Sequence, residues 1–377
     1  MSKENVIIIM IDGGRFDRSL SSTLYQNIEK NSVFFSNSIT YGPHTIAAMH
    51  AVFSGSYGTR TGTNSYWSTF DFKKEQFQTL TEYLSKNGYY TYADVINELV
   101  LPKQGFDKFI IHDEFHDNLT SRHKEILVDM NNKSKNGENF FLYLHYSNIH
   151  TGIMNNVLKK FTNYSKEFFD DKEGNAKRYD ELFLESENYL SEILKQIITL
   201  QLDKNSIILI MSDHGVSVGE KFGERAYGAF CYDYTLKTIT HFMLNKFTSK
   251  KISQQVRTID FMPTILDYLE IPLNTDNEPL DGISLMPLIK NQKLSEKIAY
   301  SETGNPLSEK QPPKKPNVMS VRNSNWKLIY NAHNNTKELY DLVDDPSELI
   351  NLIGKNLDIE QTLMNELIRI RENKKSI

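Results

Sequence analysis

The chain has 377 residues, enough for one large domain or for a domain with a small appendage. Its apolar fraction of 39% and charged fraction of 24% are typical of a soluble protein, and its net charge of −5 gives no reason to expect nucleic acid or an anionic membrane as a partner. The single cysteine, Cys231, excludes an intramolecular disulfide.

The N-terminal apolar run, Val6 to Ile11, is too short for a signal segment or a membrane span. No later segment approaches the ~20 apolar residues that a spanning helix needs. Together with the lone cysteine, this leads us to expect a cytoplasmic protein without a membrane span.

Three continuous apolar runs predict strands covered on both faces: 5–11, 140–146 and 206–212. Between them, 79–88 and 179–201 have the apolar spacing of amphipathic helices, so the sequence predicts a mainly parallel α/β sheet. Near the C-terminus, 318–331 and 337–342 resemble an antiparallel hairpin. We therefore predict a catalytic domain over 1–295 and a small strand-rich subdomain with a terminal helix over 296–377.

Chemically active side chains follow each of the three predicted strands. Asp12 comes after the first, His150 after the second, and Asp213 with His214 after the third. Ligands of parallel α/β sheets bind beyond the carboxyl ends of the strands. Carboxylates and imidazoles at that edge are the side chains that form metal sites and acid–base pairs.

Five segments, in chain order, resemble the sulfatase family of the alkaline phosphatase superfamily: "NVIIIMIDG", "FFLYLHYSNIHTG", "ILIMSDHGVSVGEKFGERAYG", "TIDFMPTILDYLEIPL" and "VRNSNWKLIYN" with "KELYDLVDDPSELINL". The resemblance implies an alkaline-phosphatase-like fold with a large central sheet flanked by helices and a small C-terminal antiparallel sheet. It also implies a divalent metal ion, and the sequence leaves open whether this is Mn²⁺, Zn²⁺, Mg²⁺ or Ca²⁺.

The segment "GPHTIAAMHAVFSG" places Thr45 at the position where sulfatases carry the Cys or Ser that is oxidised to formylglycine. Ala47 and Met49 stand where that motif has proline and arginine. Threonine cannot become formylglycine, but other branches of the superfamily use a threonine directly, for chemistry at phosphorus. A plain helix N-cap is the alternative role for Thr45.

The resemblance implies a site in which Thr45 is the nucleophile and His150 contacts the substrate. Gly13 occupies the position of a second aspartate, so we expect fewer carboxylates than in a calcium-type sulfatase site. We expect His145 to be a packed core histidine. The implied metal ligands are Asp12, Thr45, Asp213 and His214.

Three further side chains are candidate substrate contacts. His44 adjoins the nucleophile, although a loop histidine is often only solvated. Arg225 stands where sulfatases carry a histidine, and its alternative role is a surface ion pair. Lys221 is the third. The lysine that the family carries further downstream aligns with Gly228 here, so Lys221 is the candidate to replace that missing cation.

The predicted function is metal-dependent hydrolysis of a phosphodiester or phosphonate ester through a covalent Thr45 intermediate, with transfer to an acceptor alcohol as a further outcome. One alternative is a sulfate-ester hydrolase that works without formylglycine. The other is a catalytically degenerate fold-mate that binds an anion. The expected substrate is a small-molecule or saccharide-linked ester, and no basic patch indicates nucleic acid.

Overall fold

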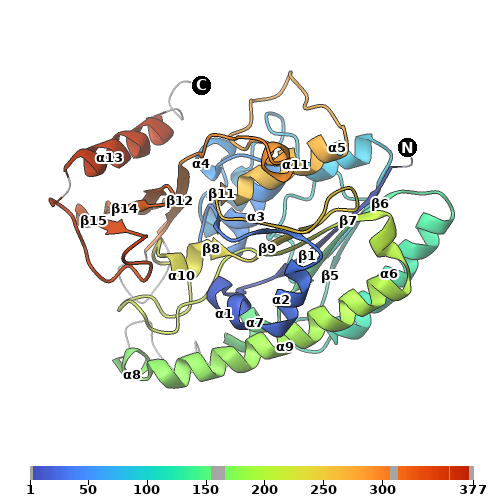
Figure 1. The fold of residues 1–377 in the computed structure, drawn as a ribbon, viewed down its shortest axis with the longest axis horizontal. Coiled ribbons are helices and arrows are strands. Elements are labelled where there is room, and N and C mark those ends of the chain that lie inside the picture. Colours follow the sequence, from blue (N-terminus) through green and yellow to red (C-terminus); the bar gives the residue numbers. More distant parts are fainter. Residues whose placement is uncertain (1–2, 154–165, 306–312, 356, 373–377) are drawn as a thin grey trace.

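A computed structural model describes residues 3–153, 166–305, 313–355 and 357–372 (Figure 1). Its core is an eight-stranded sheet, with five neighbouring strands, from β7 to β5, all parallel. This confirms the predicted mainly parallel sheet. In spatial order the strands are β10 (Lys250–Ile252), β2 (Val33–Phe35), β9 (Thr240–Met243), β7 (Ser206–Ser212), β1 (Asn5–Ile11), β6 (Phe140–Tyr146), β4 (Tyr90–Val95) and β5 (Lys108–Ile111).

Helices cover both faces of this sheet (Figure 1). Strand β1 shows why: Val6, Ile8 and Met10 pack on one face, and the residues between them pack on the other. The first face carries α3 (Thr45–Ser54), α5 (Leu80–Lys86), α11 (Phe261–Tyr268) and α12 (Met286–Ile289). The second face carries α2 (Thr23–Glu29), α6 (Leu119–Lys135) and α9 (Lys172–Thr199).

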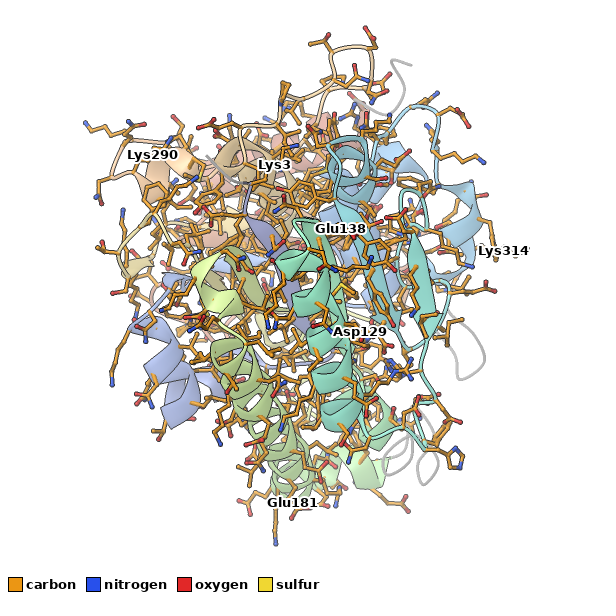
Figure 2. All side chains as sticks on the ribbon, turned by 90° about the vertical axis from the view of Figure 1, so that its right-hand side faces the viewer. Lys3, Asp129, Glu138, Glu181, Lys290 and Lys314 are labelled. Atoms are coloured by element: carbon orange, nitrogen blue, oxygen red, sulfur yellow. The ribbon has the colours of Figure 1, made fainter. Side chains whose placement is uncertain are left out.

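The two predicted helices correspond to α5 and to most of α9. Helix α9 begins earlier than the apolar pattern indicated, because Asp171 caps it by accepting a hydrogen bond from the Gly174 amide at 3.1 Å. Its outer face is charged, and Figure 2 shows Glu181 there and Asp129 on the outer face of α6. Among the described residues, no helix combines the length and apolar composition needed to cross a bilayer.

Short elements fill the connections. A three-stranded sheet is formed by β11 (Val256–Arg257), β3 (Ser38–Ile39) and β8 (Lys237–Thr238). The remaining turns of helix are α1 (Phe16–Ser21), α4 (Gly58–Thr61), η1 (Tyr66–Asp71), α7 (Asn148–Ile153), α8 (Lys166–Asp170), η3 (Leu202–Lys204), α10 (Asp233–Leu236) and η4 (Thr258–Asp260).

The C-terminal part is an antiparallel four-stranded sheet packed against a helix. It contains β12 (Ala299–Thr303), β13 (Val318–Arg322), β14 (Trp326–Asn331), β15 (Thr336–Asp341) and α13 (Leu357–Glu372). Leu363 and Leu367 of α13 pack with Val321 and Leu328 of the sheet. The predicted antiparallel subdomain is therefore present, with β12 as a strand that the sequence pattern did not indicate.

A buried ion cluster joins this sheet to α10. The Lys327 ammonium lies 2.9 Å from Asp233 Oδ1 and 2.7 Å from Glu348 Oε1, and Arg322 also pairs with Asp233. All four residues are buried except for the partly exposed Asp233. Burial alone lowers the pKa of Lys327, but the two carboxylates outweigh it and raise the pKa. Two cations and two anions thus balance in this cluster.

Candidate active site

Strand register brings the first two predicted ligands together. Strands β1 and β7 are parallel neighbours, with Ile11 paired to Ser212, so the residues that follow each strand, Asp12 and Asp213, emerge side by side. Gly13 donates its amide to Asp213 Oδ1 at 3.1 Å and has a positive φ of 71°. That left-handed conformation favours glycine, which offers no side-chain ligand to the site.

The two carboxylates are only partly satisfied by the protein. Asp12 Oδ1 and Asp213 Oδ2 are buried and have no hydrogen-bond partner among the described residues. His214 Nδ1 donates to the Gly215 carbonyl at 2.8 Å, which turns Nε2 toward the carboxylates, 3.7 Å from Asp12 Oδ1 and 3.4 Å from Asp213 Oδ2. Ligand atoms ~2.1 Å from one ion lie at about this separation from each other.

Thr45 is placed over this group by helix α3. His44 is the N-cap, its Nδ1 accepting from the Ala47 amide at 3.4 Å, and Thr45 is therefore the first helical residue and not the cap itself. Thr45 Oγ1 lies 3.4 Å from both Asp12 Oδ2 and His214 Nε2. The hydroxyl thus sits at the partly positive end of a helix that ends at Gly55 in the left-handed conformation.

His145 is fully buried in β6, as predicted for a packed core histidine, and it also contacts Asp12 of this group. Its Nε2 lies 3.0 Å from Asp12 Oδ2 and donates to it. His145 pairs with Met10 in the β1–β6 register, and the side chains of Met10 and Asp12 lie on the same face because they are two residues apart. The hydrogen bond fixes one oxygen of Asp12 and leaves the other available.

The electrostatics of the two carboxyls differ. Burial alone raises the pKa of Asp12, but the hydrogen bond from His145 and the nearby imidazoles of His150, His145 and His214 outweigh it and lower the pKa to about 2. Burial and the charge of Asp12 raise the pKa of Asp213. Two adjacent buried carboxylates without a cation are costly, which is the situation that a divalent ion relieves.

His150 lies beyond β6 in the short helix α7, as predicted for a residue at the strand end. Its Nδ1 is 2.7 Å from the Tyr227 hydroxyl, and the Tyr227 ring packs on His214 with ring centroids 4.5 Å apart. Tyr227 therefore connects His150 to the carboxylate group. The sequence offered no signal for Tyr227 beyond its place in the loop after Asp213.

The three remaining candidates differ in position. His44 is buried, and burial together with the nearby His214 lowers its pKa to about 3, so it is a neutral imidazole beside Thr45. Arg225 is buried in the loop after Asp213, and burial lowers its pKa. Lys221 contacts the C-terminal part. Its ammonium donates to the Glu348 carbonyl and lies over the Tyr232 ring. This contact links the loop after Asp213 to the C-terminal part, and the substrate contact of Lys221 stays a prediction.

The donor set fits a divalent cation. The closely grouped residues Asp12, Asp213 and His214 are all buried, and their orphaned oxygens are hard ligands next to one imidazole nitrogen. The fold and this group together define a class, an α/β protein with a divalent-metal site at the carboxyl edge of a mainly parallel sheet.

Comparison with known families narrows the class. A model described as "Sulfatase" matches residues 4–271, and one described as "N-sulphoglucosamine sulphohydrolase, C-terminal" matches residues 229–373. The chain belongs to the sulfatase family.

Two curated relatives illustrate the sequence similarity. Arylsulfatase K of Canis lupus familiaris is 26% identical over 203 residues, covering 50% of this chain and 35% of that protein. The delta 4,5-hexuronate-2-O-sulfatase of Bacteroides thetaiotaomicron is 28% identical over 174 residues, covering 43% of this chain and 34% of that protein. The matches therefore span about a third of the length of these relatives.

Solved structures match along the whole chain. A protein solved with its substrate D-glucosamine-2-N,6-O-disulfate has a TM-score of 0.76 at 18% identity, covering 99% of this chain and 98% of its own. A 2-O GAG sulfatase has a TM-score of 0.75 at 20% identity, and the match covers 100% of this chain and 94% of that protein's chain. At these identities the likeness establishes the fold.

Proposed function

We propose that this chain hydrolyses sulfate esters with a divalent ion held by Asp12, Asp213 and His214. The observation that carries the proposal is the buried group of Asp12, Asp213 and His214 with its orphaned oxygens, in a family whose matched curated relatives are named as sulfatases. Our prediction from the sequence was a phosphodiester or phosphonate ester. The comparisons favour the sulfate-ester alternative instead.

In the proposed reaction Thr45 Oγ1 attacks sulfur and the bond from sulfur to the ester oxygen breaks. His214 Nδ1–H is held by the Gly215 carbonyl, so the Nε2 lone pair is directed to the ion site. The Thr45 proton passes to Asp12 Oδ2, which faces the hydroxyl at 3.4 Å, and returns to Thr45 Oγ1 when the sulfothreonine is cleaved. A bound ion would neutralise the alkoxide and the sulfuryl oxygens. Water then cleaves the sulfothreonine at sulfur, which releases hydrogen sulfate and restores the hydroxyl.

His150 supplies the proton for the departing alcohol. The acid form is the imidazolium, whose Nδ1–H donates to the Tyr227 hydroxyl oxygen, at 2.7 Å, while Nε2 carries the second proton. That N–H protonates the leaving oxygen, and the same nitrogen then takes a proton from the attacking water.

A phosphodiester or phosphonate ester is the second candidate, and Thr45 itself favours it. A threonine cannot form the aldehyde hydrate through which sulfatases expel sulfate, whereas an ester of threonine and phosphate can be cleaved by in-line attack of water at phosphorus. The structural relative solved with a glucosamine disulfate leads us to propose a saccharide-linked ester as the substrate in either case.

A panel of p-nitrophenyl esters tests the assignment. The sulfate, phosphate monoester, phosphodiester and phosphonate are assayed with Mn²⁺, Zn²⁺, Mg²⁺ and Ca²⁺, with Thr45→Ala as the control. We expect the sulfate to be turned over fastest and the control to be inactive. Faster phosphodiester turnover would select the second candidate. Failure to bind an ion or to cleave any ester would indicate the degenerate fold-mate.

A further inference from the structure

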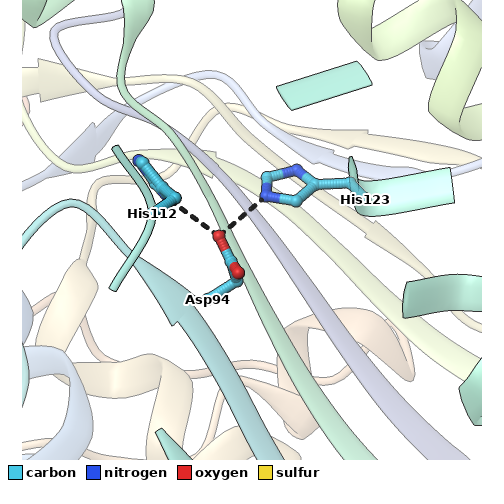
Figure 3. A group of neighbouring side chains, drawn as sticks. All are labelled: Asp94, His112 and His123. Atoms are coloured by element: carbon cyan, nitrogen blue, oxygen red, sulfur yellow. Dashed lines mark hydrogen bonds and ion pairs between the residues drawn. The ribbon is translucent and has the colours of Figure 1, made fainter. Parts of the chain in front are cut away.

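A second buried group of histidine and carboxylate side chains lies near the same sheet edge (Figure 3). Asp94 is in β4, His112 directly follows β5, and His123 is on α6. Asp94 Oδ1 accepts from His112 Nδ1 at 2.7 Å and from His123 Nε2 at 3.3 Å. Side chains along β4 alternate between the two faces of the sheet. Tyr92 packs on the face that carries α6 and α9, and Asp94, two residues further on, lies on that same face, opposite Thr45.

This group is satisfied without an ion. Arg122 donates Nε at 2.8 Å and Nη2 at 2.7 Å to Asp94 Oδ2, which balances the carboxylate charge. His123 Nδ1 is 2.6 Å from the Tyr189 hydroxyl. Each carboxylate oxygen and each ring nitrogen of the group therefore has a partner, and a divalent cation would have to displace hydrogen bonds that already exist.

The remaining ring nitrogen of the group, His112 Nε2, faces Ser147 next to the active site. His112 Nε2 lies 2.9 Å from Ser147 Oγ, so Asp94, His112 and Ser147 are connected in the order of a hydrolase triad. Ser147 is fully buried, however, and its hydroxyl is out of reach of a substrate. Asp94 holds the proton on Nδ1, and Nε2 therefore accepts from the serine hydroxyl and anchors it.

Ser147 is the residue between β6 and α7. Its carbonyl accepts a hydrogen bond from the Thr151 amide at 3.0 Å, and the Thr151 hydroxyl is 3.2 Å away. That hydroxyl is also 3.0 Å from Glu114 Oε2. His150 lies inside the turn closed by these contacts, so the position of its ring depends on where Ser147 is held.

We propose that Asp94, His112 and Ser147 are positioning residues that fix His150 for its part in the reaction. The inference rests on the proposed function, because it requires His150 to act on the substrate. A catalytic group displaced by ~1 Å typically costs about 10²-fold in rate. The chain of hydrogen bonds runs from Asp94 through His112 to Ser147, whose carbonyl closes the turn that contains His150.

Removing the serine hydroxyl is the direct test. We expect Ser147→Ala to lower kcat by about 10- to 100-fold, with KM and bound ion content nearly unchanged. Tyr189→Phe is the matched control, because it removes one hydrogen bond from the far side of the same group and leaves Ser147 anchored. It should keep the wild-type kcat. Asp94→Asn should resemble Ser147→Ala, and its assay is run well below its melting temperature.

A double-mutant cycle distinguishes positioning from general stability. Adding Ser147→Ala to His150→Ala should cause no further loss of rate, since Ser147 acts only through His150. A wild-type kcat for Ser147→Ala, or a full additional loss in the double variant, would overturn the inference. Loss of a second bound ion in Asp94→Asn would overturn it too, because the group would then be a metal site.

A spectroscopic readout separates this inference from the proposed function. The ring resonances of His150 should shift in Ser147→Ala and stay in place in Tyr189→Phe. This measurement needs no substrate, so it tests the positioning even if no ester is cleaved. Unchanged His150 resonances in Ser147→Ala would contradict the inference, whereas absent turnover with shifted resonances would contradict only the proposed function.

Discussion

The central sheet holds two buried groups of aspartate and histidine, and they differ in how their charge is balanced. Asp12 and Asp213 face each other with two oxygens that lack donors among the described residues. Asp94 lies between two histidines and carries the guanidinium of Arg122. The same residue types thus form one group whose carboxylates lack hydrogen-bond donors, at Asp12 and Asp213, and one group whose carboxylate is fully hydrogen-bonded, at Asp94.

The difference shows what identifies an ion site. Burial alone raises the pKa of both Asp94 and Asp213. At Asp94 the hydrogen bonds from His112, His123 and Arg122 reverse the effect and hold the pKa well below its usual range. At Asp213 the neighbouring Asp12 charge adds to the effect. Orphaned oxygens and like charge, more than the count of histidines and carboxylates, therefore mark the group that needs a cation.

The largest expected effect is loss of the ion itself. Asp213→Ala combined with His214→Ala should remove the bound divalent ion and abolish activity, because two of the three grouped ligands are gone. Elemental analysis of the purified variant measures this directly. His123→Gln is the control from the other group and should keep the full ion content. A double variant that retains its ion would break the comparison.

The next effect concerns the nucleophile. Thr45→Ala should lower kcat by at least ~10³-fold, since it removes the hydroxyl that faces both Asp12 and His214. Thr45→Ser should keep measurable activity. Mass spectrometry of a quenched reaction should locate the added group on the peptide containing Thr45. Activity that survives Thr45→Ala would assign the attack to another group.

His150→Ala should lower kcat by ~10²–10⁴-fold, the range for losing a general acid or base. Its melting temperature should change little, because the ring is only half-buried and packs against Tyr227. Rate assays and thermal denaturation are measured on the same preparation. A large loss of stability with a small loss of rate would mean that His150 is structural.

Matched Asp→Asn changes in the ion-free protein test the charge argument directly. Asp94→Asn should lower the free energy of unfolding by about 1.5–3 kcal/mol, since it weakens the hydrogen bonds that the buried carboxylate accepts from Arg122 and from the two histidines of its group. Asp213→Asn should leave the free energy of unfolding unchanged or raise it, because it relieves the repulsion with Asp12. Chemical denaturation with a chelator present measures both. Equal losses would remove the distinction between the two groups.

Glu224 is an intermediate case, with hydrogen bonds but no ion pair among the residues that the structure describes. Burial raises its pKa to about 7, although the Tyr234 hydroxyl and the amides of Phe230 and Ala229 oppose the shift. Because the pKa of Glu224 is higher in the folded than in the unfolded state, its protonated form stabilises the folded protein. This contribution to the free energy of unfolding is fully present below the ordinary carboxyl pKa and is lost as pH rises through about 7. The loss should be about 3 kcal/mol.

Denaturation curves across this pH range check the Glu224 assignment. Glu224→Gln keeps an acceptor for the two amides and has no proton to lose, so its stability should vary less with pH than that of the wild type. The variant should also be the more stable protein at pH 8. Identical pH profiles would show that Glu224 does not titrate in this range.

The strands β1, β6 and β7 were predictable from the sequence because each is a continuous apolar run that ends at a polar side chain. The grouping of Asp12, Asp213 and His214 followed, since parallel strands present their carboxyl ends at one edge. Thr45 was predictable as a helix-initiating residue, although His44 turned out to be the cap.

Other parts of the site depend on information that the sequence pattern does not contain. The contact of His145 with Asp12 requires the β1–β6 register, and one residue of slip would reverse the face. Strand β4 has no long apolar run, so Asp94 had no recognisable strand end to mark it. The position of Lys221 is set by the C-terminal sheet, which is remote in sequence.

The ion cluster around Lys327 has a consequence for how such chains can diversify. Asp233 lies in the part shared with the large sheet, whereas Arg322, Lys327 and Glu348 lie in the C-terminal part. Removing one member would strand an opposite charge in the interior, a cost of about 3–5 kcal/mol. Recombination that exchanged the C-terminal module between related chains would therefore have to carry all four residues as one inherited set.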